Sequence, residues 1–171
     1  MARRTGLREF QLSLGERLRV AATSKAAVSS RLGFQVGADN WFVALHQVSE
    51  VIPVPNSVTV PLTHPWFRGV ANVRGNLYSI IDFSGFQGHD TTGPGMEKRV
   101  ILISERLLGG AGLVVSRMLG LRNPDQFTRL ERPAEAAPWV GGVYAAAGGT
   151  KWLELDLPAL VRQPGFLEVG T

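Results

Sequence analysis

The stretch RGVANVRGNLYSIIDF, Arg68–Phe83, decides the fold of this chain because it combines the pattern of a hairpin with that of a buried strand. Two apolar, partly β-branched runs, Val70–Val73 and Leu77–Ile81, flank Gly75-Asn76, where a tight reversal needs positive φ. We therefore predict two antiparallel strands joined at Gly75-Asn76. Arg74 would stand at the mouth of this turn, where its guanidinium can bind a carboxylate on another molecule through paired hydrogen bonds. An ordinary solvated arginine is the alternative.

The strand pattern continues on both sides of this hairpin. Upstream, Leu32, Phe34 and Val36 alternate with other residues, and a second strand follows a turn at residues 37–40. Downstream, further strands are predicted at 99–103, 112–115 and 118–121, followed by a last hairpin around Gly148-Gly149. Short strands at roughly ten-residue spacing, with turn residues between them, are typical of a β-barrel or sandwich. We expect a mainly β body with short helices.

Several shorter segments carry signals of their own. His46–Val51 is predicted to make one helical turn, and Pro53 places the residues around it at a sheet edge or in a loop. Pro65 is compatible with the first turn of a short helix. The proline- and charge-rich segment 123–138 indicates a crossover connection. Asp156 is expected to cap a short helix that runs through Val161.

The positive charge of the chain is concentrated at its start. The 171 residues carry a formal net charge of +4, and residues 1–31 hold seven Lys and Arg against Glu9 and Glu16. The remaining residues are close to neutral, without the basic stripe expected of a nucleic-acid-binding fold. Apolar residues at three- and four-residue steps from Leu7 to Ala21 predict an N-terminal amphipathic helix that docks on the body or on a partner.

The composition limits the possible environment and chemistry. No apolar run approaches the roughly 20 residues needed to span a bilayer, and the start of the chain lacks a secretory h-region, so we expect no direct membrane insertion. The chain contains no cysteine, which excludes disulfides and thiolate metal sites and fits a reducing cytoplasm. A nucleic-acid-binding module that uses the basic N-terminal segment is kept as the alternative function.

No recognised catalytic pattern is present. The histidines His46, His64 and His89 lie in unrelated contexts, and we expect no metal and no cofactor. Asp82 follows a strand and is expected to cap the turn after Phe83, although an enzyme that uses Asp82, Glu50 and a histidine is a possible rival. Alternatively, Glu50 could bind a charged group of a partner protein.

Four blocks of sequence resemble the CheW family of chemotaxis coupling proteins, in the order found in that family. They are VSEV from Val48, HPWFRGVANVRGNLYSIIDF from His64, GLVVSRMLGL from Gly112 and LELDLPAL from Leu153. The sequence of the second block is most similar to that of PilI-type members, which serve type IV pilus and twitching-motility systems. We therefore divide the chain into a basic N-terminal helical extension, 1–30, a CheW-like domain, 31–165, and a C-terminal tail, 166–171.

The resemblance implies two small SH3-like β-barrels that share a core, with short helices and no active site. It implies a cytoplasmic, non-catalytic adaptor between methyl-accepting chemoreceptors and a CheA-type histidine kinase. Receptor binding would fall to Val48, Glu50 and Arg74, and kinase binding or coupling to Arg68, Gly69 and Gly75. Ser79 and Ser116 depart from the family pattern, which leaves open whether the receptor is the usual one or a dedicated one.

Overall fold

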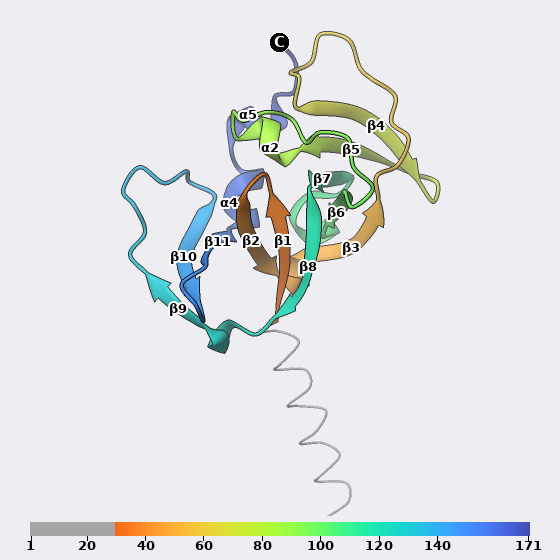
Figure 1. Ribbon diagram of the computed structural model, residues 1–171. Coiled ribbons are helices and arrows are strands. Elements are labelled where there is room, and N and C mark those ends of the chain that lie inside the picture. Colours follow the sequence, from red (N-terminus) through yellow and green to blue (C-terminus); the bar gives the residue numbers. More distant parts are fainter. Residues whose placement is uncertain (1–29) are drawn as a thin grey trace, which may run out of the picture.

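The computed structural model describes residues 30–171, which form two β-sheets joined by loops and a few short helices (Figure 1). The expected mainly β fold is confirmed. The expected N-terminal helical extension lies outside the described residues. Among residues 30–171, no helix combines the length and hydropathy needed to cross a bilayer.

A six-stranded sheet is assembled from the two ends of the described chain. Its strand order is β8-β1-β2-β11-β10-β9, and β11 lies parallel to β2 while the other neighbours are antiparallel. The predicted alternation on the first strand is confirmed, because Leu32, Phe34 and Val36 are all buried. The strands are β1 Arg31–Val36, β2 Asp39–Ala44, β8 Arg117–Arg122, β9 Phe127–Leu130, β10 Val140–Ala146 and β11 Lys151–Leu155.

A five-stranded sheet is formed by the middle of the chain. Its order is β3-β6-β7-β5-β4, with a parallel pair between β5 and β7. Strand β3 is an edge strand, as the proline at its end predicts. The strands are β3 Val48–Pro53, β4 Phe67–Val73, β5 Asn76–Asp82, β6 Arg99–Ile103 and β7 Ala111–Val115.

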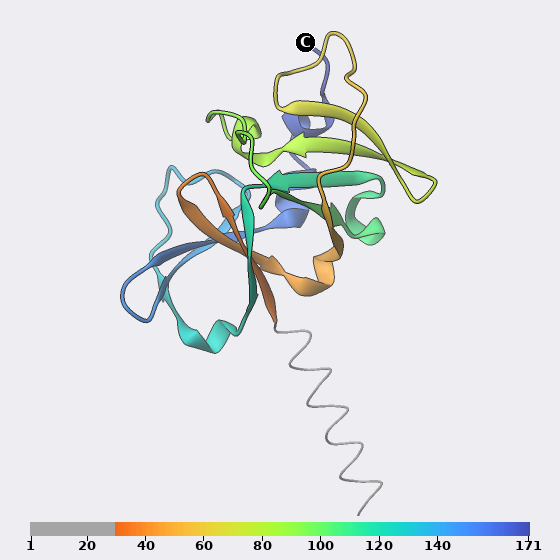
Figure 2. The ribbon, with the colours of Figure 1, turned by 45° about the vertical axis from the view of Figure 1, so that its right-hand side comes forward.

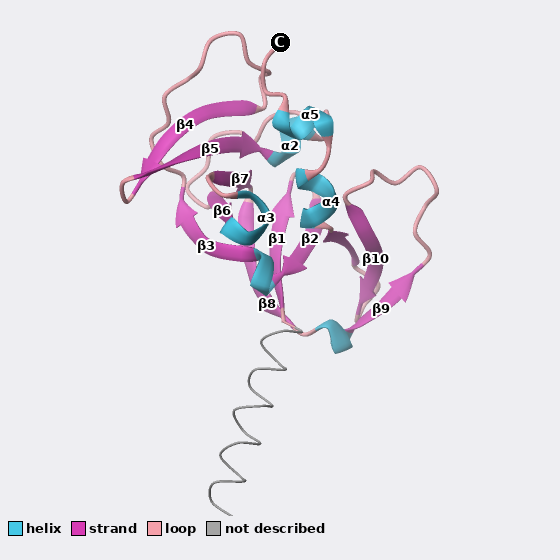
Figure 3. Ribbon diagram, turned by 180° about the vertical axis from the view of Figure 1, so that it is seen from behind, coloured by secondary structure: helices cyan, strands magenta, loops and turns pink. Residues whose placement is uncertain are grey.

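The helices are short and lie at the ends of strands (Figure 3). The expected cap at Asp156 is confirmed, because its Oδ1 accepts a hydrogen bond of 2.8 Å from the backbone N–H of Ala159. The helices are α2 Phe83–Phe86, α3 Glu105–Leu108, α4 Leu157–Val161 and α5 Pro164–Leu167, with 3-10 turns η1 Leu45–Gln47 and η2 Pro124–Gln126.

One apolar core lies between the two sheets, and the five-stranded sheet encloses a second. Neighbouring residues such as Ile80 and Ile81 separate into the two cores, because successive side chains of a strand point to opposite faces. The second core draws on every strand of its sheet, including the edge strands β3 and β4, so this sheet curls around it. Its buried members are Ile52, Ala71, Ile80, Val100, Leu102 and Val114.

The turn of the Arg68–Phe83 hairpin lies one residue earlier than the sequence predicts. The structure joins β4 to β5 through Arg74-Gly75, with Val73 paired to Asn76, so Asn76 belongs to the strand. Both turn residues have positive φ, 52° for Arg74 and 89° for Gly75. Asn72 explains this register, because its Oδ1 accepts a hydrogen bond of 2.8 Å from the backbone N–H of Gly75.

Three other local predictions were wrong. The segment His46–Val51 makes only part of a 3-10 turn, because Val48 already pairs with Ile103 in the sheet. Pro65 lies in a turn and does not begin a helix. The segment 123–138 contains the strand β9, whose pairing with β10 outweighs its polar composition.

The segment 166–171, expected as a tail, packs on the body in the structure. Phe166 is 1% exposed within the shared core. Gly170 forms an isolated β-bridge with Thr63, and the backbone N–H of Thr171 donates to the carbonyl of Leu62. The end of the chain is therefore tied to the long loop between β3 and β4, as Figure 2 shows at the top of the molecule.

Candidate functional site

The structure brings two of the predicted receptor-binding residues into direct contact. Arg74 Nη1 donates to Glu50 Oε2 and Arg74 Nη2 to Glu50 Oε1, both at 2.6 Å. This is the bidentate geometry in which a guanidinium binds a carboxylate most specifically. Glu50 lies on the edge strand β3 and Arg74 in the β4–β5 turn, so the pair joins the two ends of the curled sheet.

The Glu50–Arg74 pair is open to solvent. The side chain of Arg74 is 72% exposed and that of Glu50 is 37% exposed. The hydrogen bonds from Arg74 hold the pKa of the Glu50 carboxyl below its ordinary value, and those to Glu50 raise the pKa of Arg74. Because both side chains are exposed, a partner can contact them directly. An exposed ion pair also contributes little to folding stability.

Val48, the third predicted receptor-binding residue, lies at the start of the same strand as Glu50. It is partly buried and packs against the shared core. A β-bulge separates it from Glu50, because the register against β6 shifts between these two residues. A bulge changes the direction in which side chains leave a strand, so this bulge sets the relative orientation of the Val48 and Glu50 side chains.

Arg68, whose side chain is partly exposed, is bound by a different carboxylate that lies inside the protein. Its Nε and Nη2 donate to Asp82 Oδ2 at 3.1 and 2.8 Å, and Nη2 also donates to the carbonyl of Thr92 at 3.0 Å. Asp82 is fully buried and also accepts hydrogen bonds from the backbone N–H of Gly85 and from the backbone and hydroxyl of Thr92. The predicted capping role of Asp82 is confirmed by the first of these bonds.

Sequence reasoning missed the partnership of Arg68 with Asp82, although a signal for it was present. In the observed hairpin Phe67 pairs with Ile81 and Gly69 with Ile80, so Arg68 is the bulged residue opposite these two, close to Asp82 at the end of β5. A turn at Gly75-Asn76 shifts the pairing of the two strands, so that Asp82 is no longer the expected neighbour of Arg68. The Thr92 contacts carried no such signal, because they come from a loop.

The two glycines assigned to coupling occupy very different surroundings. Gly69 has φ of +111°, and a Cβ there would lie 2.1 Å from the carbonyl oxygen of Val58. Gly75 has φ of +89° with open space around it. Gly69 is therefore required both by its backbone and by the close approach of a loop, whereas Gly75 is required by its backbone alone.

The predicted coupling residues do not form one cluster. Arg68 and Gly69 lie at the beginning of β4 and Gly75 lies in the turn after its end. Arg74 follows Arg68 by six residue steps along the strand, which corresponds to roughly 20 Å. Gly75 adjoins the Glu50–Arg74 pair instead.

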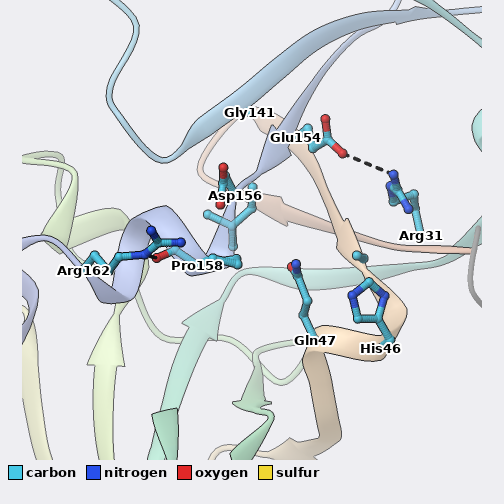
Figure 4. Close-up of a pocket in the computed structure, with 10 residues that line it drawn as sticks. Arg31, His46, Gln47, Gly141, Glu154, Asp156, Pro158 and Arg162 are labelled. Carbon is cyan, nitrogen blue, oxygen red and sulfur yellow. Dashed lines mark hydrogen bonds and ion pairs between the residues drawn. The ribbon is translucent and has the colours of Figure 1, made fainter. Parts of the chain in front are cut away.

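A polar cleft of about 450 Å³ opens between the start of β1, the turn η1 and the helix α4. Figure 4 shows side chains of both charges around it, with Arg31 Nη2 placed 3.4 Å from Glu154 Oε1. Asp156 is engaged as a helix cap, and Arg162 Nε donates to the carbonyl of Pro158. The lining residues are Arg31, Ala44, His46, Gln47, Gly141, Glu154, Leu155, Asp156, Pro158 and Arg162.

The residues of the rival enzyme hypothesis lie apart. Glu50 and Asp82 are bound to different arginines. His64 stacks on Trp66, at 5.4 Å between ring centroids, while His46 lines the polar cleft. Within residues 30–171, no group of three His, Asp or Glu side chains is arranged to hold a metal ion.

Comparison with known proteins gives a consistent result. The family model described as a CheW-like domain matches residues 31–165. The chain is 35% identical over 145 residues to Protein PilI of Pseudomonas aeruginosa, an alignment that covers 82% of this chain and 80% of that protein. The scaffolding protein TtCheW of Thermoanaerobacter tengcongensis has the same fold, with a TM-score of 0.66 at 20% identity over 80% of this chain and 94% of that one.

Proposed function

This chain belongs to the CheW-like domain family, and from that membership we propose that it is a non-catalytic adaptor that couples a methyl-accepting chemoreceptor to a CheA-type histidine kinase. The 35% identity to PilI supports a role in the signalling system of type IV pili and twitching motility. We further propose that the protein works in the cytoplasm, and that its two sheets correspond to the SH3-like barrels of the family.

The observation that carries this proposal is the preformed Glu50–Arg74 pair. Both side chains are exposed, and their bidentate contact fixes the donor and acceptor groups before any partner arrives. A fixed charge pair gives orientation and selectivity at an interface while leaving affinity modest, which suits an adaptor that must exchange partners. Together with Val48, this pair is the proposed receptor-binding site.

We propose that Arg68 and Gly69 affect kinase binding indirectly, by holding the loops that flank β4 in place. The guanidinium of Arg68 is already bound to Asp82 and Thr92, and Gly69 faces the Val58 carbonyl. Substitution of either residue would move the loops that flank β4, and the kinase would then meet an altered surface. Gly75 acts through the shape of the turn that presents Arg74.

The adaptor proposal is tested by measuring the binding of two purified partners to the full chain. One is a chemoreceptor signalling hairpin and the other is the regulatory domain of a CheA-type kinase. Arg74→Asn should weaken receptor binding at least about tenfold, a loss of about 1.4 kcal/mol, while kinase binding stays within about twofold. Arg129→Ala is the matched control, because Arg129 is exposed on the edge strand β9 of the other sheet. Failure of the unmodified chain to bind either partner would refute the proposal.

The alternative of a nucleic-acid-binding module rests on the basic segment 1–30, outside the described residues. In the body, Arg68 and Arg74 are both occupied by carboxylates. A salt titration of binding to single- and double-stranded nucleic acid distinguishes the two functions, because phosphate contacts give a steep loss of affinity with salt.

A further inference from the structure

The two-residue turn between β4 and β5 holds an arginine in a conformation that this residue type disfavours. Arg74 and Gly75 both have positive φ, 52° and 89°. The pairing of Val73 with Asn76 closes the hairpin around them. A turn of this length and conformation is ordinarily made by Asn-Gly, because an arginine at positive φ is sterically strained. Strained residues of this kind occur at binding sites, where the surrounding structure holds them in place.

The strained conformation places the guanidinium of Arg74 at the Glu50 carboxylate. Nη1 and Nη2 each donate to one oxygen of Glu50 at 2.6 Å, although 72% of the Arg74 side chain is exposed. A long exposed side chain has many conformations of similar energy, and only a narrow set of them gives a bidentate contact. The direction in which Arg74 leaves the turn therefore decides whether the pair forms.

Neither residue of the turn fixes that direction by itself. Gly75 is conformationally permissive, and a Cβ at this position would meet nothing within 4 Å. Arg74, taken alone, is more stable at negative φ. The conformation of the turn must therefore be held by a contact from outside these two residues.

The side chain of Asn72 supplies this contact. Its Oδ1 accepts a hydrogen bond of 2.8 Å from the backbone N–H of Gly75. That N–H belongs to the planar peptide group that joins Arg74 to Gly75, so the bond fixes the backbone on the C-terminal side of Arg74. The backbone on the N-terminal side is fixed by strand β4, which ends at Val73. Arg74 is thus held at both ends.

Asn72 has no other interaction that would give it a different structural role. It is exposed, and its side chain makes no second hydrogen bond with any residue from 30 to 171. The net contribution of one exposed hydrogen bond to folding stability is small. Loss of this bond would therefore loosen the turn without unfolding the protein.

We propose that Asn72 is a positioning residue for receptor binding, which holds Arg74, through the N–H of Gly75, in the conformation that meets Glu50. The inference rests on the adaptor function proposed above. Asn72 acts through Arg74 and not by touching the receptor. Without its hydrogen bond, Arg74 would have to be ordered again each time a partner binds, at a cost in conformational entropy.

The first test is the titration of the Glu50 carboxyl at low salt, followed by its side-chain NMR chemical shift, which requires no partner. The hydrogen bonds from Arg74 lower the pKa of Glu50, and Arg74→Asn removes them. In Asn72→Ala the pKa of Glu50 should rise at least about halfway from the unmodified value to that of Arg74→Asn.

Asn76→Ala is the matched control for this titration. Asn76 follows the same turn and is exposed, but its side chain makes no hydrogen bond with any residue from 30 to 171. The pKa of Glu50 should therefore stay at its unmodified value in Asn76→Ala. An unchanged pKa in Asn72→Ala, or an equal rise in both alanine variants, would overturn the inference.

The second test is a double-mutant cycle on the binding of a chemoreceptor signalling hairpin to the full chain. Asn72→Ala should weaken binding at least about threefold, and the same change made in Arg74→Asn should weaken it no further. Equal losses on both backgrounds would show that Asn72 touches the receptor directly, which contradicts the positioning role. If the unmodified chain does not bind the hairpin, the adaptor function is wrong, and the Glu50 titration still decides whether Asn72 positions Arg74.

Discussion

The sharpest stability prediction concerns the contact between Arg68 and the buried carboxylate of Asp82. Asp82 is fully buried and accepts five hydrogen bonds, from Arg68 Nε and Nη2, Gly85 N, Thr92 N and Thr92 Oγ1. We would replace Arg68 by Met and Asp82 by Asn, separately and together. Met keeps most of the length of the arginine stem, and Asn keeps the shape of the carboxylate and remains a good helix cap.

The magnitude follows from the bonds that each change removes. Arg68→Met removes three charge-assisted hydrogen bonds, two to Asp82 and one to the Thr92 carbonyl, and leaves a buried carboxylate, which costs about 2–3 kcal/mol. The lower end applies because the Arg68 side chain is 37% exposed. Asp82→Asn keeps the bond from Gly85 but turns an amide donor toward other donors, at a similar cost of about 2–3 kcal/mol. The double variant should lose less than the sum, by at least about 1 kcal/mol, since each single change breaks the same pair.

Urea unfolding measures these free energies, followed by the fluorescence of the four tryptophans. Amide exchange gives a second readout, because the N–H of Thr92 should lose its protection in either single variant. Additive losses, with coupling below about 0.3–0.5 kcal/mol, would show that Arg68 does not stabilise the fold through Asp82. The positional role proposed for Arg68 would then be wrong.

Three further predictions concern the hairpin and the edges of its sheet. Arg74→Asn should leave the urea midpoint unchanged or raise it, because Asn tolerates the positive φ of this turn better than Arg does, and a clear loss of stability would contradict the exposed pair. Gly69→Ala should cost at least about 2 kcal/mol in urea unfolding, whereas Gly37→Ala, at a positive φ in open space, should cost less; equal losses would contradict the close approach of the Val58 carbonyl. The contribution of Glu50 to stability should be fully present above its ordinary pKa of 4.5 and be lost as pH falls below it, because Arg74 lowers the pKa in the folded state. Glu50→Gln should abolish this part of the pH dependence in urea unfolding at low salt, and an unchanged pH profile would argue against the pair.

The sequence was most informative where one physical signal dominated. Alternation located β1, and its prediction is confirmed by the burial of Leu32, Phe34 and Val36. The cap at Asp156 depended on a local hydrogen bond and was also predicted correctly. Strand β9 was not predicted, because it is stabilised by pairing with β10 and the polar residues of β9 give no local strand pattern.

The candidate site was predictable in composition but not in geometry. Glu50 and Arg74 were both selected from the sequence, yet their contact depends on how the sheet curls. Local pattern carries no information on curling, because it arises when the edge strands share one core. The contacts of Arg68 with Thr92 and of Gly69 with Val58 could not be predicted either, because both partners lie in loops whose path is not set by a strand pattern.

The order in which the strands occur along the chain has a consequence for biosynthesis. All strands of the five-stranded sheet lie within residues 48–115, so this sheet is complete when the ribosome has released that segment. Strands β1 and β2 emerge first but must wait for β8 and β11, the neighbours that complete their pairing. Because domains fold as they emerge, the central sheet should serve as the template on which the first and last parts of the nascent chain later meet.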